Sequence, residues 1–290
     1  MATLRDIKRK IDAVKKTSQI TKAMNMVAAA KLRGAQQTME KFHPYSVKFK
    51  EVIRRLASGA EDDGSFALLA RPEQVKKIEL VLVTADRGLC GSFNNNLIIT
   101  AERFIRDRKA EGIDVVLTVV GRKGAEYFRR RRYDMRKAVT GVLNKVSYDD
   151  AYSLGQELIE NFSTGAADEV YVIYSRFVSV VRQLPTLEKL LPLAPEKSEE
   201  DGPKLDYLYE PSHQALLTDL LPNYVYIQLL EFFYQTAVGE HAARMAAMEN
   251  ATSNAKELVR TLTLTYNKAR QAGITKELMD IVGGVEALKK

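Results

Sequence analysis

The chain has 290 residues, enough for one or two domains with their own hydrophobic cores. Its 44 Lys and Arg against 37 Asp and Glu give a formal net charge of +7, which favours an acidic partner such as nucleic acid, an anionic membrane or an acidic protein surface. The single cysteine excludes an internal disulfide and a CxxC-type zinc site. No apolar signal region opens the chain, and no run approaches the roughly 18 apolar residues of a membrane span. We expect a soluble or peripheral protein of a reducing, bacterial-type cytoplasm.

Residues 1–57 are predicted to form one long helix. Leu4, Ile7, Ile11 and Val14 recur at the alternating three- and four-residue steps of a coiled coil. At about 1.5 Å per residue this helix would reach roughly 80 Å. It also carries a row of basic side chains: Lys8, Arg9, Lys10, Lys15, Lys16, Lys22, Lys31 and Arg33. These form either a solubilising face or a positive shaft for an acidic surface.

Residues 75–205 alternate between strand-like and helix-like segments and are predicted to form a Rossmann-like α/β domain. In chain order the segments are a strand at 77–85, a helix at 96–109, a strand at 114–121, a helix at 122–132 and a strand at 169–181. This order indicates right-handed crossovers and a mainly parallel sheet. The charged stretch 195–204 is predicted to be a loop.

Residues 210–290 are predicted to form a second coiled-coil helix, since the chain has no proline after Pro222 and repeats apolar residues in heptads from Ile274 to Leu288. From Pro222 onward it would extend roughly 100 Å. The first helix enters the α/β domain and the last one leaves it, so the two would pack antiparallel. The predicted fold is α/β with long helices: an antiparallel two-helix coiled coil and a central α/β domain.

The predicted seam of this coiled coil is uneven. Ser18, Thr21, Thr261 and Thr265 fall at interior positions, where they bury little apolar surface. The apolar end of the last helix, 274–288, outreaches the shorter first helix. Such an overhang requires an apolar sleeve supplied by another protein.

The loop DRGLCG, Asp86 to Gly91, follows a strand and precedes a helix, as phosphate-binding loops do. It lacks the lysine and the third glycine of the established motifs. A nucleophilic Cys90 would need a base within hydrogen-bond reach, and the chain has only three histidines. We therefore expect a plain turn in which Cys90 is a small packed residue, with no catalytic residue, cofactor or metal.

The basic run Arg129 to Arg132, flanked by Tyr127, Phe128 and Tyr133, has the composition of a surface that contacts nucleic acid through phosphates and stacking. Four consecutive arginines on a helix point in different directions, which favours a solvated helix end or an interface with an acidic subunit. A basic nucleic-acid-binding coiled-coil protein remains an alternative, and a small α/β nucleotide enzyme is a third.

Several separated segments resemble, in order and spacing, the signatures of the gamma subunit of F-type ATP synthases of bacterial type. They are ITKAMNMVAAAKLR (20–33), TADRGLCG (84–91), LDYLYEPS (205–212), ARMAAMENATSNAKEL (243–258) and YNKARQAGITKEL (266–278). The resemblance spans essentially the whole chain. It implies a non-catalytic rotor shaft inside a ring of three alpha and three beta subunits, with the α/β domain on the epsilon subunit and the membrane c-ring.

The same resemblance implies that the shaft couples proton flow through the c-ring to conformational changes at the catalytic sites on beta. It implies peripheral attachment on the cytoplasmic side of the cell inner membrane, with no cofactor and no nucleic acid. Two departures from the family pattern stand out. Gly273 replaces the usual Ala or Ser, at a cost of up to ~1 kcal/mol in helix propensity. The cysteine-bearing insertion of chloroplast relatives is absent, so thiol regulation of that kind is not expected.

The resemblance also assigns partner contacts to individual residues. Against beta it places Lys22, Met24 and Lys31 on the first helix, Arg244 on the last helix, an upper contact of Arg270, Gln271, Thr275 and Glu277, and the loop residues Arg87, Gly88 and Cys90. In that loop Arg87 would be the charged contact, while Gly88 and Gly91 would permit the turn. Tyr207 would contact the c-ring and epsilon.

Overall fold

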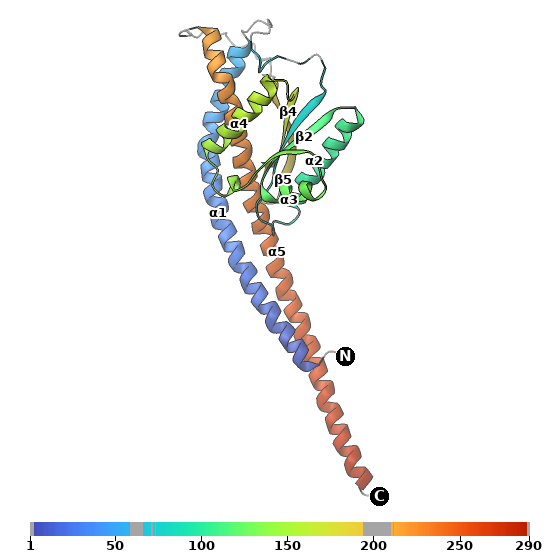
Figure 1. Cartoon of the computed structure of the whole chain (residues 1–290). Coiled ribbons are helices and arrows are strands. Elements are labelled where there is room, and N and C mark those ends of the chain that lie inside the picture. The colour runs from blue at the N-terminus through green and yellow to red at the C-terminus, as the bar shows by residue number, and fades with distance from the viewer. Residues whose placement is uncertain are drawn as a thin grey trace. The chain divides into compact units, whose positions relative to one another are not determined.

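The computed structural model describes residues 3–58, 66–70, 72, 74–193, 210 and 212–288. It divides into two compact units, one made of Met1–Ala28 with Met245–Lys290 and the other of Ala29–Arg244. Two long helices contribute to both units: α1, Leu4–Ser58, and α5, His213–Leu288 (Figure 1). The predicted class of long helices with a central α/β domain is confirmed. Helix α5 begins before Pro222, which lies inside it.

In the first unit, the coiled coil, α1 and α5 contribute complementary buried positions. These are Ile7, Ile11 and Ala28 from α1, and Met248, Thr252 and Ala255 from α5. Polar contacts add to the seam, because the hydroxyls of Thr21 and Thr252 lie 2.7 Å apart and the Asn25 side-chain amide donates to the Met245 carbonyl at 2.9 Å. The contacts define the register of the two helices as well as their packing.

The polar seam predicted from sequence is correct in part. Thr21 lies in the interface and Ser18 is half-buried, but Thr261 and Thr265 are exposed. Their hydroxyls donate to carbonyls one turn earlier in α5, those of Glu257 and Thr261, at 3.2 and 3.0 Å. The prediction for these two threonines was wrong because the half-buried side chains of this stretch of α5 are Leu262, Tyr266 and Ala269, and each threonine lies one residue before a seam position.

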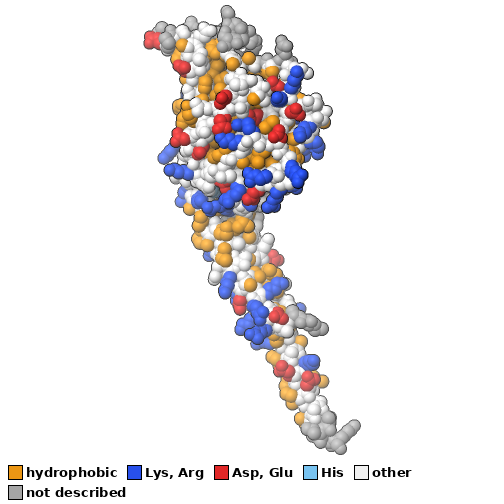
Figure 2. All heavy atoms as spheres, viewed as in Figure 1, with side chains coloured by type: hydrophobic (Ala, Val, Ile, Leu, Met, Phe, Trp, Pro, Cys, Tyr) orange, Lys and Arg blue, Asp and Glu red, His pale blue; other side chains and the backbone are white. Residues whose placement is uncertain are grey.

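The end of α5 carries apolar side chains that nothing in the coiled-coil unit covers. Ile274, Leu278 and Ile281 are between 49% and 63% exposed, and Met279 and Val282 are exposed as well. Figure 1 shows this end of the helix running on past the start of α1, and Figure 2 shows apolar side chains on its surface. The sequence-based expectation of an uncovered apolar overhang agrees with this arrangement.

The second unit is built on a five-stranded sheet of order β3-β2-β1-β4-β5. The strands are β1 Lys77–Val83, β2 Asp114–Val120, β3 Met135–Val139, β4 Glu169–Phe177 and β5 Gln183–Leu191. Strands β1 to β4 pair in parallel, whereas β5 is antiparallel to β4, with Tyr174 opposite Thr186. The mainly parallel sheet predicted from sequence is therefore present, with two edge strands that the sequence did not reveal.

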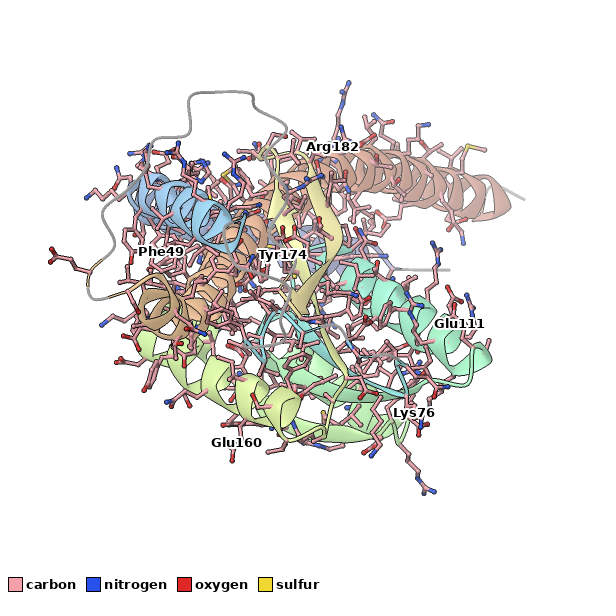
Figure 3. All side chains as sticks on the ribbon, turned by 90° about the horizontal axis from the view of Figure 1, so that it is seen from above. Phe49, Lys76, Glu111, Glu160, Tyr174 and Arg182 are labelled. Atoms are coloured by element: carbon pink, nitrogen blue, oxygen red, sulfur yellow. The ribbon has the colours of Figure 1, made fainter. Side chains whose placement is uncertain are left out.

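Each face of the sheet has its own hydrophobic core. Helices α2, Phe93–Ala110, and α3, Arg122–Arg130, pack on the face that carries Leu80 and Leu82. Helix α4, Tyr148–Ser163, together with parts of α1 and α5, packs on the face that carries Val81 and Val83 (Figure 3). A short 3-10 turn, Val142–Asn144, joins β3 to α4. The alternation of side chains along β1 thus divides its apolar residues between two helical layers.

One buried carboxylate ties several of these elements together. Glu79 on β1 is 3% exposed and accepts hydrogen bonds from Thr118 at 2.5 Å, from Arg136 at 2.5 and 2.8 Å and from Asn161 at 2.8 Å. A buried carboxylate is tolerated only with such partners. The network therefore fixes β2, the edge strand β3 and helix α4 against β1.

Helix α4 approaches α5 closely through a glycine. A β-carbon on Gly155 would lie 2.4 Å from Cδ1 of the Tyr226 ring, closer than any unstrained contact. We expect Gly155→Ala to lower the free energy of unfolding by about 1–2 kcal/mol, because the overpacking outweighs the gain in helix propensity. Gly34→Ala is the matched control, since its β-carbon would meet nothing within 4 Å. Chemical denaturation of the two variants and the parent tests this, and an equal stabilisation by both substitutions would contradict the close approach.

Candidate functional site

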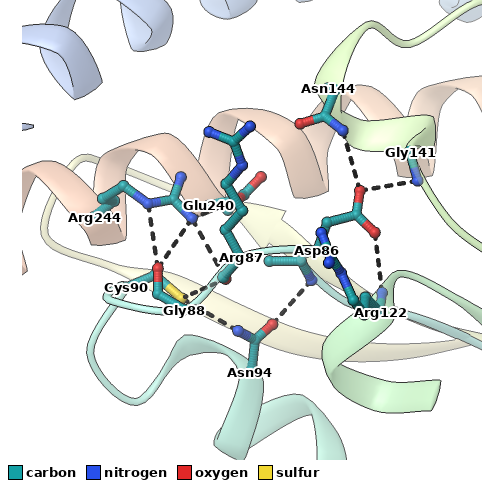
Figure 4. A network of polar contacts seen from close by, with 11 residues as sticks. Asp86, Arg87, Gly88, Cys90, Asn94, Arg122, Gly141, Asn144, Glu240 and Arg244 are labelled. Atoms are coloured by element: carbon teal, nitrogen blue, oxygen red, sulfur yellow. Dashed lines mark hydrogen bonds and ion pairs between the residues drawn. The ribbon is translucent and has the colours of Figure 1, made fainter. Parts of the chain in front are cut away.

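The loop between β1 and α2 lies at the carboxyl edge of the sheet. Strand β1 has β2 on one side and β4 on the other, so the chain order reverses here, and open parallel sheets hold their ligands at this point. In this protein helix α5 lies at the point where such a sheet would hold its ligand. A β-carbon on Gly239 of α5 would be 3.0 Å from Oγ of Ser175 and 3.3 Å from the ring of Phe93. The side chains that α5 presents next to the loop are those of Glu240 and Arg244 (Figure 4).

Arg244 holds the backbone of the loop. Its guanidinium donates to the carbonyl oxygen of Gly88 at 3.3 and 3.4 Å and to that of Arg87 at 3.5 Å. The same group pairs with Glu240 at 2.6 Å. The Arg244 side chain is 12% exposed, so most of its hydrogen-bonding capacity is used within the chain.

Two further side chains anchor the ends of the loop. Asp86 is buried and accepts from the backbone N–H groups of Arg122 at 3.0 Å and Gly141 at 2.9 Å, which links the loop to the starts of α3 and of the turn after β3. Asn94 accepts from the N–H of Ala85 at 2.9 Å and donates to the sulfur of Cys90 at 3.2 Å. Three of these bonds satisfy backbone N–H groups that would otherwise be unpaired just after β1, at the start of α3 and in the turn after β3.

The residues between these anchors differ sharply in exposure. Cys90 is 2% exposed, and burial raises the pKa of its thiol, although the nearby Arg244 acts in the opposite direction. Arg87 and Leu89 are exposed and Gly88 is half-buried. Gly91 has a φ angle of 60°, as the predicted turn requires. The backbone of Gly88 lies outside the left-handed region, and Leu89, with a φ angle of 62°, occupies that region instead. No local pattern in the sequence marks this leucine.

Buried ionisable groups surround the loop on the α5 side. Burial raises the pKa of Glu240, an effect that Arg244 partly offsets. Burial, with the positive charges of Arg244 and Lys31, lowers the pKa of His241 to about 4. Within the described residues Nδ1 of His241 has no hydrogen-bond partner, so the neutral imidazole is the form that the fold accommodates.

The predicted contact residues on α1 are only partly at the surface. Lys22 and Lys31 are exposed, whereas Met24 is half-buried. The neighbouring Met26 and Val27 are each 58% exposed, and sequence reasoning did not select them. Both lie inside the matched segment 20–33, in the apolar run MVAAA, which was the available signal for them.

The four residues of the predicted upper contact, Arg270, Gln271, Thr275 and Glu277, are all exposed on α5. Arg270 and Gln271 precede the apolar stretch that begins at Ile274, and Thr275 and Glu277 lie within it. Gly273 is half-buried, and a β-carbon there would meet nothing within 4 Å. The predicted foot residue Tyr207 lies outside the described residues.

Over the part of the chain that the structure describes, no three His, Cys, Asp or Glu side chains are grouped so that they could hold a metal ion. Among the same residues, no helix is both long and apolar enough to cross a membrane.

Comparison with known proteins gives one consistent family. The sequence profile described as ATP synthase matches residues 3–288. An ATP synthase gamma chain from Syntrophobacter fumaroxidans is 76% identical over all of both chains, and one from Nitratidesulfovibrio vulgaris is 47% identical, again over all of both chains. The chain belongs to the ATP synthase gamma chain family.

Chains in solved structures of mitochondrial ATP synthases share the fold. A chain of the Euglena gracilis mitochondrial ATP synthase, in a structure described as OSCP, F1 and c-ring, aligns over 98% of this chain and 94% of its own, with a TM-score of 0.67 and 21% identity. A chain of the Tetrahymena thermophila enzyme, described as central stalk and c-ring, aligns over 80% and 99% with a TM-score of 0.61 and 21% identity. The predicted family and fold are therefore confirmed, and the nucleic-acid alternative is not supported.

The basic run of this gamma family member has partners within the chain. The guanidinium of Arg131 lies 3.7 Å above the Tyr127 ring, and its Nε is 3.9 Å from Glu102 of α2. Arg129, Arg130 and Arg132 are exposed. The run therefore ends α3 with one stacked arginine and three exposed ones, which fits both sequence-based interpretations, a solvated helix end and an interface with an acidic subunit.

His241 makes the stability of the gamma fold depend on pH. Its pKa is about 4 in the folded chain, against an ordinary value of 6.5, so acid favours the unfolded state that can take up the proton. This contribution to stability is complete above the ordinary pKa and is lost as the pH falls toward the folded value. Between neutral pH and about pH 5 the free energy of unfolding should fall in both proteins. We expect this fall to be about 2 kcal/mol smaller in His241→Gln than in the parent. Unfolding free energies at both pH values measure this, and equal losses would contradict the buried neutral imidazole.

Proposed function

We propose that this chain is the central rotor shaft of a proton-translocating F-type ATP synthase. It couples proton flow through a membrane c-ring to conformational changes at the catalytic sites of a ring of three alpha and three beta subunits. The observation that carries the proposal, beyond family membership, is the apolar end of α5: Ile274, Leu278 and Ile281 lie exposed on a helix that nothing in the coiled-coil unit covers. An apolar sleeve formed by the ring would bury these side chains.

The mechanism follows from symmetry. Three chemically equivalent sites on beta differ in conformation only if something of lower symmetry stabilises a different state at each. A single shaft with one basic helix and one apolar end presents a different surface in each direction, and its rotation passes the states around the ring. The chain performs no bond chemistry in this scheme.

Partner contacts are proposed where the family motifs fall. Lys22, Met24 and Lys31 would meet an acidic lever on beta, and Arg270, Gln271, Thr275 and Glu277 would meet a higher loop of beta. Arg87 and the loop around Gly88 and Cys90 would lie against the lever region, with Arg244 beside it. Tyr207 would contact epsilon and the c-ring. The complex would then be attached to the cell inner membrane, and we propose the cytoplasmic side for this chain.

Assembly tests the proposal directly. We expect the tagged chain, produced together with its alpha, beta and epsilon subunits, to purify as one copy for every three alpha and three beta subunits, as native mass measurement would show. An apolar helix end that is buried in the ring should also make the free chain poorly soluble. Recovery of the chain only as a stable free monomer or homodimer, with the ring subunits present, would exclude the shaft role.

Met24 tests coupling. Met24→Lys adds a positive charge beside Lys22 on a half-buried part of the shaft, which changes its interaction with an acidic lever. We expect ATP hydrolysis to continue while ATP-driven proton pumping in membrane vesicles falls several-fold relative to hydrolysis. Met24→Leu keeps the volume and apolar character and is expected to match the parent. A proportional fall of both rates in Met24→Lys would mean that the residue supports assembly and not coupling.

A further inference from the structure

The last part of α5 differs from the rest of the helix in what supports it. Gly273 is the last half-buried residue among the described side chains of α5, and the residues from Ile274 to Val285 are all exposed. We call residues 274–288 the α5 tip. A helix in water gains most of its stability from tertiary packing, and unpacked stretches of this length are marginal even in favourable sequences. The free tip therefore depends on the helix propensity of its own residues.

The sequence of the tip, ITKELMDIVGGVEAL, has a low helix propensity. Residues with a branched β-carbon lose rotamer freedom in a helix, and they are frequent here: Ile274, Thr275, Ile281, Val282 and Val285. Two adjacent glycines, Gly283 and Gly284, follow near the end of the helix. Relative to alanine, each glycine lowers the local equilibrium constant for helix formation about fivefold. The tip thus combines unfavourable residues with the absence of covering side chains among the described residues of its unit.

No contact within the described chain requires the two glycines of the tip. A β-carbon on either one would meet nothing within 4 Å, and neither glycine has a positive φ angle. Glycines in the packed helices are different. A β-carbon on Gly155 would lie 2.4 Å from the Tyr226 ring, and one on Gly239 would lie 3.0 Å from Oγ of Ser175. The tip glycines therefore weaken the helix without allowing a close contact in return.

We propose that the α5 tip folds as it inserts: it is largely open in the free chain, and it becomes helical when the apolar sleeve of the ring covers it. This inference rests on the proposed function. Ile274, Leu278 and Ile281 are spaced by four and three residues, so they form one apolar face only while the tip is helical. Covering that face supplies the packing that the free helix lacks, which couples the ordering of the tip to its burial.

The two glycines determine how strong this coupling is. They favour the open tip in the free chain, so part of the interaction with the ring is used to order the backbone. Alanine at both positions would keep the apolar face unchanged and reduce that ordering cost. The glycine pair is therefore the place at which folding of the tip can be changed without removing any apolar side chain.

Hydrogen exchange of the backbone amides, followed by mass spectrometry on the free full-length chain, tests the inference without a partner. We expect the tip of the parent to exchange at nearly the rate of an unfolded peptide, while the stretch around Thr252, which contacts Thr21, is protected. Replacing both Gly283→Ala and Gly284→Ala should slow exchange of the tip on the order of fivefold. Gly34→Ala is the matched control, because this glycine lies inside α1 with nothing within 4 Å of its β-carbon, and it should leave exchange of the tip unchanged.

The assembled complex provides the second measurement. In the complex purified with alpha, beta and epsilon subunits, the tip of the parent should exchange at least about tenfold more slowly than in the free chain. The double-alanine variant and the parent, each with its own tag, are then supplied in equal amounts to limiting alpha and beta subunits. The variant should enter the complex at least as well as the parent, since less ordering accompanies its insertion.

Each other outcome overturns the inference. A tip that is as protected as the Thr252 stretch in the free parent would already be folded, and equal exchange in the free and assembled parent would show that insertion orders nothing. Equal exchange of the double-alanine variant and the parent, or equal slowing by Gly34→Ala, would remove the role of the glycine pair. Poorer incorporation of the double-alanine variant would mean that a partner approaches the glycine backbone closely. Failure of the parent itself to enter the complex would instead refute the proposed function, and exchange in the free chain would still report whether the tip is folded.

Discussion

The packing of α5 against the sheet is the interaction on which the α/β unit depends. Leu217, Leu229 and Phe233 are fully buried in the core that α5 shares with the sheet and α4, and the ring of Phe232 stacks 4.3 Å from that of Tyr174 on β4. Because α5 lies so close, it covers the edge at which a doubly wound sheet holds a ligand. The architecture of a nucleotide-binding domain is thereby used to hold a helix, and the loop after β1 becomes part of a protein surface.

The polar groups that α5 brings to this edge are costly unless they are paired. Glu240 and Arg244 are both largely buried, and a buried ion pair adds little net stability compared with apolar residues of the same volume. The pair orients the Arg244 side chain, because the guanidinium that neutralises Glu240 also donates hydrogen bonds to two carbonyls of the loop. The loss of Arg244 would therefore leave a carboxylate buried alone and two carbonyls without these bonds. Stability and loop geometry are linked at one residue.

The elements that were predicted from sequence are those whose signal is local. Strands β1 and β2 are continuous apolar runs, and the long helices repeat apolar residues at coiled-coil spacing. The edge strands β3 and β5 were missed because MRKAV is largely polar and Pro185 interrupts QLPTLEKLL, although an edge strand tolerates both. In the loop, glycines suggested positive φ at Gly88, yet the structure places it at Leu89, because tertiary contacts with Arg244 and Asn94 override local preference. The contact residues came from family resemblance, and no local pattern marks them.

The exposed end of α5 extends the same reasoning to the whole complex. A helix in water is stabilised mainly by tertiary packing of its apolar face, and residues 274–285 are all exposed among the described residues of the coiled-coil unit. Its apolar side chains raise the free energy of the isolated chain and become favourable only where a partner covers them. In the proposed shaft, this end of α5 would draw its stabilisation from the surrounding ring, so that folding of the subunit and assembly of the complex would be coupled.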